Sequence, residues 1–282
     1  NETDPLDAND NAATSSRTTD LFSRYALYAF GRLRINDGVQ CTTAVCRVGA
    51  LGNSSYDYAL VLGRSSSVDS AWAGGDVWLR DYATVSGALY TRDTVVYQSS
   101  NYTAPSVEGN AEISDSLLPM GFSLPSVPDL SDEDSVQVSA GDSYSLAPGN
   151  YSLVKVNNNA TLILSGGDYR IGSFSLAYAS ALQLDTSNGE PVRIFASGEL
   201  NWKCDITSGG EAKRLASKLL LVYYGTSLTL ERNFAGAVLA PNASLSLGQT
   251  GKDFYGMAIG QNVEIHQYSR IHYQPFFYGL KD

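Results

Sequence analysis

Residues that commonly carry enzyme chemistry are scarce in this chain. Among its 282 residues there are two histidines and three cysteines, and there is no GxSxG motif of the kind that forms a nucleophile elbow. The histidines, His266 and His272, could bind a metal ion with Glu264 if they met on adjacent strands. The alternative is that His272 caps one end of the fold while His266 faces solvent. We expect no catalytic residues, no metal and no cofactor.

Charge is also sparse, and it is mostly of one sign. Charged residues make up 17% of the chain, and the formal net charge is −10 with a pI near 4.6. No basic stripe is present, which argues against nucleic acid as a partner and against adsorption to an anionic bilayer. No run of about 20 apolar residues occurs, so we expect no membrane span. The hydrophobic content of 43% is that of a folded chain.

The chain begins at Asn1 and shows no leader, so we expect a mature protein whose leader has been removed. The expected location is extracellular or on the cell surface. Cys41 and Cys46 bracket four residues, and they can form a disulfide if the loop turns back on itself. The alternative is three reduced thiols. Cys204 is expected to be buried.

Two stretches near the C-terminus repeat each other at an interval of 20 residues. They read FAGAVLAPNASLSL (234–247) and FYGMAIGQNVEIHQ (254–267). Three positions keep the same residue in both copies: Phe234 and Phe254, Gly236 and Gly256, Asn242 and Asn262. A period of about 20 residues with alternating apolar positions is typical of a solenoid. We predict an all-β fold, a single-stranded parallel β-helix of right hand, with the two asparagines stacked at turns.

A shorter echo has an interval of 12 residues and joins 75–81 to 87–93. Its copies are two successive strands within larger coils, or two shorter rungs. Each copy ends in an Arg-Asp pair, Arg80-Asp81 and Arg92-Asp93. If the rungs stack, these pairs predict a charge ladder that fixes register. The alternative is a site where carboxylate and arginine bind an acidic sugar.

Composition divides the chain into a polar tail and one domain. Residues 1–18 predict a flexible tail or a docking segment, and residues 19–282 predict the β-helix domain. Apolar residues 20–30 predict an N-terminal cap, a short helix that seals the open end of the solenoid, with an opening strand as the alternative. Prolines cluster at about 99–135, which predicts a loop along the side of the solenoid rather than a boundary between subdomains.

Tyrosine is abundant, with 18 residues, and many tyrosines lie in or beside the expected strands. Tyr82, Tyr90 and Tyr97 follow one another in the strand-rich stretch 75–97. If exposed along one face, they would form a strip that binds sugar rings or another protein. The alternative is that they pack as core or rim residues.

Several segments resemble a known bacterial module. LAPGNYSLVKV, LILSGGDYRIGSFSL and FAGAVLAPNASLSLGQTGKDFYGMAIGQNVEIHQYSRIHY are similar to the β-helical module of the choice-of-anchor A group and its PilX-associated relatives. The glycine-led rungs also resemble bactofilin-type proteins. The resemblance covers 136–275 well and 25–98 loosely. It implies an extracellular β-helix used in adhesion, anchoring or appendage assembly, and it brings no catalytic residues.

These features predict a non-enzymatic extracellular protein, either a surface adhesin or a component of a pilus or filament. The expected partners are a second copy, docked end to end or through the tail, other surface proteins, or glycans. The alternative is a polysaccharide-active β-helix enzyme, a lyase or hydrolase, or a carbohydrate-binding module. An enzyme would need convergent carboxylates in a cleft, whereas a binding module would need an exposed aromatic strip.

Overall fold

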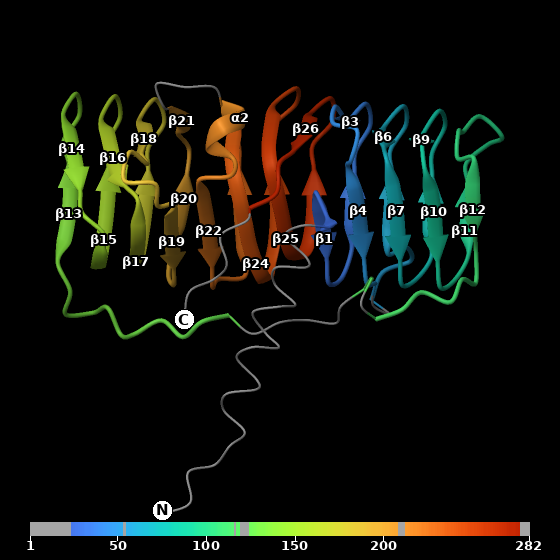
Figure 1. The fold of residues 1–282 in the computed structure, drawn as a ribbon, viewed down its shortest axis with the longest axis horizontal. Helices are drawn as coiled ribbons and strands as arrows, with labels where there is room; N and C mark the ends of the chain where they lie inside the picture. Colours follow the sequence, from blue (N-terminus) through green and yellow to red (C-terminus); the bar gives the residue numbers. More distant parts are fainter. Residues whose placement is uncertain (1–23, 53–54, 116, 119–123, 208–211, 277–282) are drawn as a thin grey trace, which may run out of the picture.

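Alternating apolar and polar residues fold this chain into a parallel β-solenoid of about 12 turns (Figure 1). The computed structural model describes residues 24–52, 55–115, 117–118, 124–207 and 212–276. Within those ranges the regular structure is β-strand, apart from a helical position at Arg24 and the four-residue helix α2 (Ala212–Leu215). The all-β parallel solenoid expected from the sequence is therefore confirmed, whereas its hand stays a prediction.

The strands form three parallel ladders, which we call faces A, B and C. From one end of the stack to the other, face A contains β12 (Ser106–Glu108), β10 (Ala88–Thr91), β7 (Ser70–Ala73), β4 (Arg47–Ala50), β1 (Leu27–Ala29), β25 (Asp253–Ile265), β24 (Phe234–Leu247), β22 (Leu219–Tyr223), β19 (Val192–Ala196), β17 (Gly167–Leu176) and β15 (Gly149–Val156). The long strands bend at the corners and continue onto a neighbouring face.

Face B contains β11 (Val95–Tyr97), β8 (Val77–Leu79), β5 (Leu60–Leu62), β2 (Leu33–Ile35), the C-terminal parts of β25 and β24, β23 (Ser227–Leu230), β20 (Leu200–Trp202), the C-terminal parts of β17 and β15, and β13 (Ser135–Val138). Face C contains β9 (Thr84–Val85), β6 (Ser67–Val68), β3 (Gln40–Cys41), β26 (Arg270–Tyr273), the first residues of β25 and β24, and a separate sheet of β21 (Asp205–Thr207), β18 (Ala181–Asp185), β16 (Thr161–Ser165) and β14 (Ser143–Leu146).

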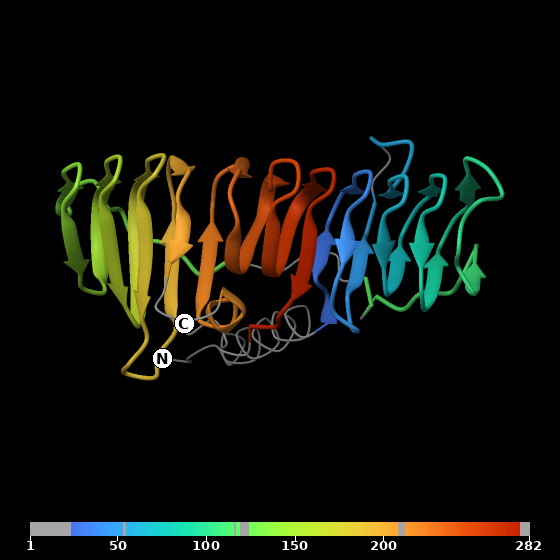
Figure 2. The same cartoon turned by 90° about the horizontal axis from the view of Figure 1, so that it is seen from above.

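The order of coils in space differs from their order in the chain. Strand β1 lies in the middle of the stack, where it pairs with β4 on one side and with β25 on the other. Coils run outward from β1 to β12, and the chain then returns along the side to β13 at the opposite end (Figure 1). From β13 the coils run inward to β26. Figure 2 shows the first and last coils side by side in the middle of one continuous row.

One coil is built from both ends of the described chain, and we call it the closing coil. Strand β26 supplies its face C, while β1 and β2 supply its faces A and B. The next coil pairs with it through β3, where Ile271 lies opposite Cys41. Because both edges of the closing coil are paired, two strand edges that would otherwise be exposed are removed.

Of the two expectations for residues 20–30, the described part shows the opening strand and not the N-terminal cap. Leu27–Ala29 is a strand inside the stack, and it does not seal an open end. The physical reason is that the edge of β25 offers β1 a partner along its whole length, which a terminal helix could not use. The predicted tail, residues 1–18, lies outside the described residues.

The 20-residue repeat holds for part of each coil. Phe234 pairs with Phe254 and Gly236 with Gly256, as the sequence pattern predicted. The expected stacking of Asn242 on Asn262 is wrong, because Asn262 lies opposite Ser244. The register shifts after Ala240, where β24 carries two residues more than β25, and the interval on face B becomes 18. Asn242 lies in this irregular stretch and is exposed.

The 12-residue echo is not a rung spacing. In that part of the chain Val77 pairs with Val95 and Ala71 with Leu89, so the interval between coils is 18. The two copies therefore lie on faces B and A as successive strands of larger coils, one of the two expected arrangements. The predicted Arg-Asp ladder is wrong as a consequence. Arg80 pairs instead with Asp37 at 2.6 Å, and Arg92 pairs with Asp115 at 2.7 Å.

The interior of the solenoid is filled by stacked residues from successive coils. A row of aromatic rings runs along the axis, and its neighbouring ring centres lie 5.5–5.9 Å apart: Phe174, Trp202, Phe234 and Phe254. All four side chains are almost completely buried. Such ring contacts stabilise the fold beyond the burial of apolar surface, and they help to fix the register of these coils.

A second apolar cluster lies outside the solenoid, on the outer surface of face A. It includes Leu220, Leu239, Ile259 and other outward residues of this face. The returning segment, whose described parts are 109–115, 117–118 and 124–134, covers this surface, and we call it the strap. Its apolar residues join the cluster: Ala111, Ile113, Leu117, Leu118, Leu124 and Val127. In the middle of the stack, the strands of face A are thus buried on both sides.

Hydrogen bonds hold the strap on both sides of the closing coil. The hydroxyl of Tyr25 donates to the carbonyl of Leu117, and that of Tyr224 donates to the carbonyl of Pro125 at 2.7 Å. Burial raises the pKa of Tyr224 to about 12, so the hydroxyl keeps its proton at neutral pH. Arg92 donates to the carbonyl of Ile113 at 2.6 Å. The strap therefore ties the N-terminal coils to the C-terminal coils.

Gly256 offers a test of the register between β24 and β25. Its φ is +127°, and an added Cβ would overlap the carbonyl of Gly236 in the next coil. We expect Gly256→Ala to destabilise the fold by about 3 kcal/mol, since left-handed strain adds to the steric overlap. The control is Gly189→Ala, at φ +82° with open space around it, for which we expect a loss of about 1 kcal/mol. Urea unfolding measures both, and equal losses would contradict the register.

Candidate binding surface

An open groove crosses face B at the closing coil. Two adjoining hollows share Arg34 of β2 and Glu264 of β25. The first has a volume of about 270 Å³ and continues to Arg32, Tyr56 and Asn262. The second continues toward the corner with face C, past Asn36 and Arg80. Because β2 comes from the start of the chain and β25 from its end, the groove exists only when the closing coil is formed.

Polar side chains in the groove hold one another in place. Glu264 accepts a hydrogen bond from the Asn36 side chain at 2.8 Å and lies 3.9 Å from Arg34. The side-chain oxygen of Asn262 accepts from the backbone N–H of Arg32 at 3.0 Å, and its amide nitrogen lies 3.2 Å from the Ser244 hydroxyl. The carboxylate of this site is therefore already engaged by a donor and by a cation.

The corner between faces B and C is a stack of left-handed turns. Tyr268, Gly38, Ser65 and Tyr82 occupy the same position in four successive coils, each with φ between 56° and 70°. The N–H of each residue donates to a carbonyl in the next coil: Tyr268 to Asp37 at 2.9 Å, Gly38 to Arg64 at 2.7 Å, Ser65 to Asp81 at 3.0 Å, and Tyr82 to Asn101. This backbone ladder fixes the direction in which the side chains leave the corner.

Three tyrosines on this corner are the most exposed of the large apolar residues described. Tyr82 is 54% exposed, Tyr268 is 60% exposed and Tyr178 is 61% exposed. Arg64 lies 5.7 Å from the centre of the Tyr82 ring, and Arg232 lies 4.7 Å from that of Tyr178. Tyr82 lies three coils from Tyr268, and Tyr178 lies four coils from Tyr268 on the other side. With a rise of ~4.8 Å per coil, these separations are about 14 Å and about 19 Å along the axis. We call these residues the tyrosine row.

The predicted strip of Tyr82, Tyr90 and Tyr97 is not one surface. Tyr90 lies on the outer side of face A, half-buried, and its ring centre is 6.4 Å from that of Trp72. Tyr97 ends β11 on face B and stacks on Tyr102 at 4.4 Å. The sequence placed them together because they follow one another in one strand-rich stretch, whereas the strands that carry Tyr90 and Tyr97 lie on different faces. Tyr178 and Tyr268 were missed, although each lies in the turn that follows a face B strand, as Tyr82 does.

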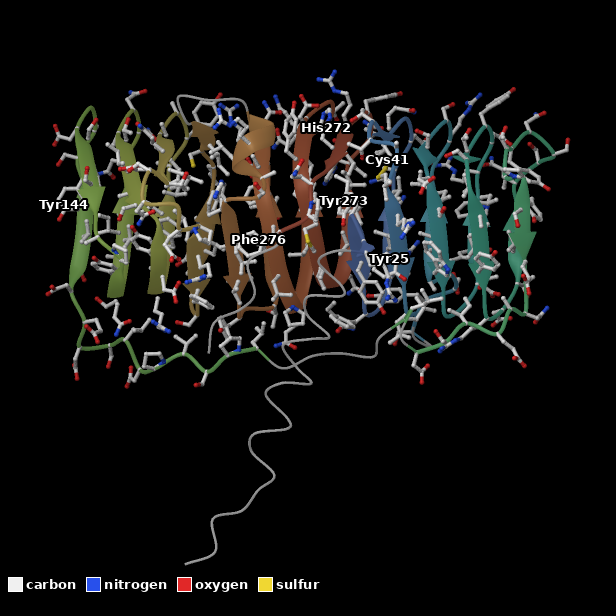
Figure 3. The ribbon with its side chains drawn as sticks, in the orientation of Figure 1. Tyr25, Cys41, Tyr144, His272, Tyr273 and Phe276 are labelled. Atoms are coloured by element: carbon white, nitrogen blue, oxygen red, sulfur yellow. A yellow bond between two sulfur atoms is a disulfide. The ribbon has the colours of Figure 1, made fainter. Side chains whose placement is uncertain are left out.

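The structure joins Cys41 and Cys46 in a disulfide, with 6.0 Å between their Cα atoms. The bond closes the corner between β3 of face C and β4 of face A, next to the closing coil. Cys204 is buried and lies outside this disulfide. Figure 3 places Cys41 close to His272, across the junction between the two ends of the chain.

His272 belongs to a compact polar cluster on face C. One ring nitrogen lies 3.0 Å from Asp253 and the other lies 2.6 Å from the Thr42 hydroxyl, while the ring stacks on Tyr255 at 4.1 Å. Arg270 donates to both oxygens of Asp253, at 2.7 and 2.8 Å. This order of Thr, His and Asp resembles a catalytic triad, but the bidentate arginine neutralises the carboxylate that would have to stabilise a charged imidazole. The cluster instead links β3 to β25 and β26.

The two histidines do not form a metal site. His266 lies on the corner between faces B and C, 2.8 Å from the Ser246 hydroxyl, whereas His272 lies on face C. No group of three or more residues suited to hold a metal ion is found in the described part of the chain. Within the same ranges, no helix has the length and apolar character needed to cross a membrane.

Comparison with known families gives one match. Residues 18–273, most of the chain, match the model of a family described as "Putative Ice-binding-like adhesive domain". The comparisons with curated proteins and with solved structures gave no match. The match supports the broader expectation of a β-solenoid with an adhesive role. The resemblance to the choice-of-anchor A, PilX-associated and bactofilin types stays a prediction.

Asp253 makes the stability of the closing coil depend on pH. Burial acts to raise the pKa of this carboxyl, but hydrogen bonds from Arg270 and His272 outweigh it and hold the pKa below its ordinary value. The ionised carboxylate therefore stabilises the fold fully above the unfolded-state pKa of about 3.9. This stabilisation is lost as the pH falls through the lower pKa of the folded state. We expect Asp253→Asn to cost up to about 1 kcal/mol at pH 7.

The cost of Asp253→Asn should shrink toward zero once the pH lies below the lowered folded-state pKa of Asp253, where Asp is protonated in both states. Urea unfolding at a series of pH values measures the difference from the unsubstituted protein. Asp132→Asn, at an exposed position outside the cluster, is the control and should show little change at any pH. A cost that stays the same from pH 7 down to the lowest pH at which the protein is folded would contradict the role of Asp253.

Proposed function

Because the chain belongs to the family of putative ice-binding-like adhesive domains, we propose that it is a non-enzymatic extracellular adhesin that binds a polysaccharide. The tyrosine row on the corner between faces B and C is the observation that carries this proposal. Its three rings stand more than half exposed on a rigid edge of the solenoid. A tyrosine ring offers an apolar face to the C–H groups of a sugar and a hydroxyl to its polar groups.

The spacing of the tyrosine row suits an extended polymer better than a compact ligand. Steps of about 14 and about 19 Å along the axis require a partner that spans several coils. The backbone ladder of the corner positions Tyr82 and Tyr268 before binding, so little conformational entropy is lost when a chain docks. The disulfide supports an oxidising, extracellular location.

Features of the groove support an adhesive rather than an enzymatic role. A glycosidase needs two carboxyl groups that face the scissile bond from opposite sides. Here Glu264 is held by Asn36 and Arg34, and Asp37 is paired with Arg80. Both carboxylates are thus neutralised by neighbouring arginines, an arrangement suited to holding a surface rigid. The polysaccharide-active enzyme remains the alternative that an activity assay would reveal.

Loss of the tyrosine row should weaken binding to polysaccharide. We expect the triple variant Tyr82→Gly, Tyr178→Ala, Tyr268→Gly to bind at least about tenfold more weakly, since it loses three ring contacts of roughly 1 kcal/mol each. Glycine is chosen at the two left-handed positions because it adopts positive φ without strain. Biolayer interferometry on a panel of immobilised long polysaccharides measures the effect, and the panel also identifies the polymer.

The matched control is Tyr144→Ala, which removes an exposed tyrosine of β14, on face C at the end of the solenoid (Figure 3). Binding of this variant should equal that of the unsubstituted protein. If the triple variant binds as tightly as the control, or if no polysaccharide on the panel binds the unsubstituted protein, the proposal fails.

End-to-end assembly is a second candidate, and the terminal coil favours it. In the described residues β13 pairs only with β15 and β14 only with β16, which leaves one edge of each open. Tyr144 of β14 lies opposite the buried Leu162 of β16 but is itself 46% exposed, because no further coil covers it. Acidic residues lie at both ends of the stack, with Asp132, Glu133 and Asp134 beside β13 and Glu108 in β12. End-to-end contact would therefore bring like charges together.

We expect assembly, if it occurs, to increase with ionic strength, because salt screens the repulsion between acidic ends. Sedimentation velocity from low to high salt measures the size of the particles. Tyr144→Lys should abolish any assembly that uses this end. Monomers under all conditions, or assembly that salt weakens, would remove this second candidate and leave the adhesin proposal untouched.

A further inference from the structure

Arg32 lines the groove on face B, and no carboxylate of the described residues forms an ion pair with it. It directly precedes β2, and its guanidinium lies 5.6 Å from the centre of the Tyr56 ring. Its Nε atom is buried and has no hydrogen-bond partner in the described part of the chain, and no ion pair of Arg32 is found there either. A buried donor without a partner costs about 1–3 kcal/mol, and more when it is charged. Because Arg32 also lines the first hollow, its guanidinium is placed to meet a ligand that accepts hydrogen bonds.

The hollow beside Arg32 contains the other groups that a polar ligand needs. Its walls carry the Tyr56 ring, the hydroxyls of Ser227 and Ser244, and the side chain of Asn262. The volume of about 270 Å³ is at the small end for ligand pockets, with room for one or two sugar rings rather than a protein segment. Tyr56 is 37% exposed, so one face of its ring is open to a ligand.

The local charge selects an anion. Two arginines, Arg32 and Arg34, face one carboxylate, Glu264, which already accepts from Asn36. This leaves an excess of one positive charge in a chain whose net charge is −10. A guanidinium matches a planar carboxylate or a sulfate with two parallel hydrogen bonds, and the match is strongest where water is partly excluded.

We propose that this hollow is a subsite for one acidic sugar unit, bearing a carboxylate or a sulfate. Arg32 donates to the anionic group, the Tyr56 ring packs on a face of the sugar, and Asn262 and Ser244 meet its hydroxyls. The inference rests on the proposed adhesin function and names the class of polymer, an acidic polysaccharide. Since Arg32 comes from the start of the chain and Asn262 from its end, the bound sugar also bridges the closing coil.

Short probes separate this subsite from the tyrosine row, because they cannot span several coils. The probes are trigalacturonate, a sulfated chondroitin disaccharide and neutral maltotriose, and titration calorimetry measures the affinity of each. We expect trigalacturonate or the sulfated disaccharide to bind, with maltotriose at least about tenfold weaker. The preferred probe then decides between carboxylate and sulfate. A bound probe should also raise Tm, since it binds the folded chain alone.

Arg32→Gln should weaken binding of the acidic probe by roughly 10- to 100-fold, since it loses a hydrogen bond to a charged group. Arg32→Lys keeps the charge but loses Nε, so we expect an intermediate affinity. Lys155→Gln removes one exposed positive charge elsewhere on face B and is the matched control. The tyrosine triple variant should bind the short probe as the unsubstituted protein does.

Two results would overturn the subsite: neither acidic probe binds, or Arg32→Gln binds the acidic probe as tightly as Lys155→Gln does. Either result leaves the adhesin proposal standing if the tyrosine triple variant still loses binding to long polysaccharide. Conversely, the tyrosine triple variant could keep its binding to long polysaccharide while binding of the short probe still depends on Arg32. That pair of results would overturn the adhesin proposal and leave the subsite as a saccharide site that does not act with the tyrosine row.

Discussion

Parallel pairing between the first and last strands of the described chain is the constraint on which the rest of the structure depends. Strands β1 and β2 lie on β25, and β3 lies on β26, so the two halves form one continuous stack. Each half alone would expose the strand edges that now pair with the other half in the middle of the stack. Such exposed edges are unfavourable for a monomer. The Asp253–His272–Thr42 cluster, the disulfide and the groove all gather around this junction.

The same topology decides which faces are available. A chain that starts in the middle and returns from one end to the other needs a long connection, and the strap is that connection. It covers the outer surface of face A, whose apolar residues would otherwise form an exposed patch. Faces B and C remain open, and the groove and the tyrosine row lie on face B and at the corner between B and C. Covering one face thereby restricts binding to the others.

Rigidity connects the fold to the proposed function. A corner of left-handed turns joined by backbone hydrogen bonds leaves little freedom for the chain, and its tyrosines are presented at intervals set by the coils. The polar groups of the groove are similarly held by one another. A surface of this kind binds without rearrangement. This property suits an extended polymer, whose repeating units contact the surface at several places. The excess positive charge at Arg32 adds selectivity on a surface that is otherwise acidic.

The sequence by itself determined the coil. Alternation of apolar residues gave the strands, the repeat gave the pairing of Phe234 with Phe254 and of Gly236 with Gly256, and the spacing of Cys41 and Cys46 allowed the disulfide. It did not determine the order of the coils, because any two parallel edges with matching apolar rows can pair, and nothing local marks β1 as the partner of β25. The shift after Ala240 was hidden for a similar reason, since a two-residue irregularity preserves alternation. Only the tertiary structure placed Tyr178 and Tyr268 on the same corner as Tyr82, and Arg32 beside Asn262. Residues that lie 230 positions apart in the chain meet there because the stack closes in its middle.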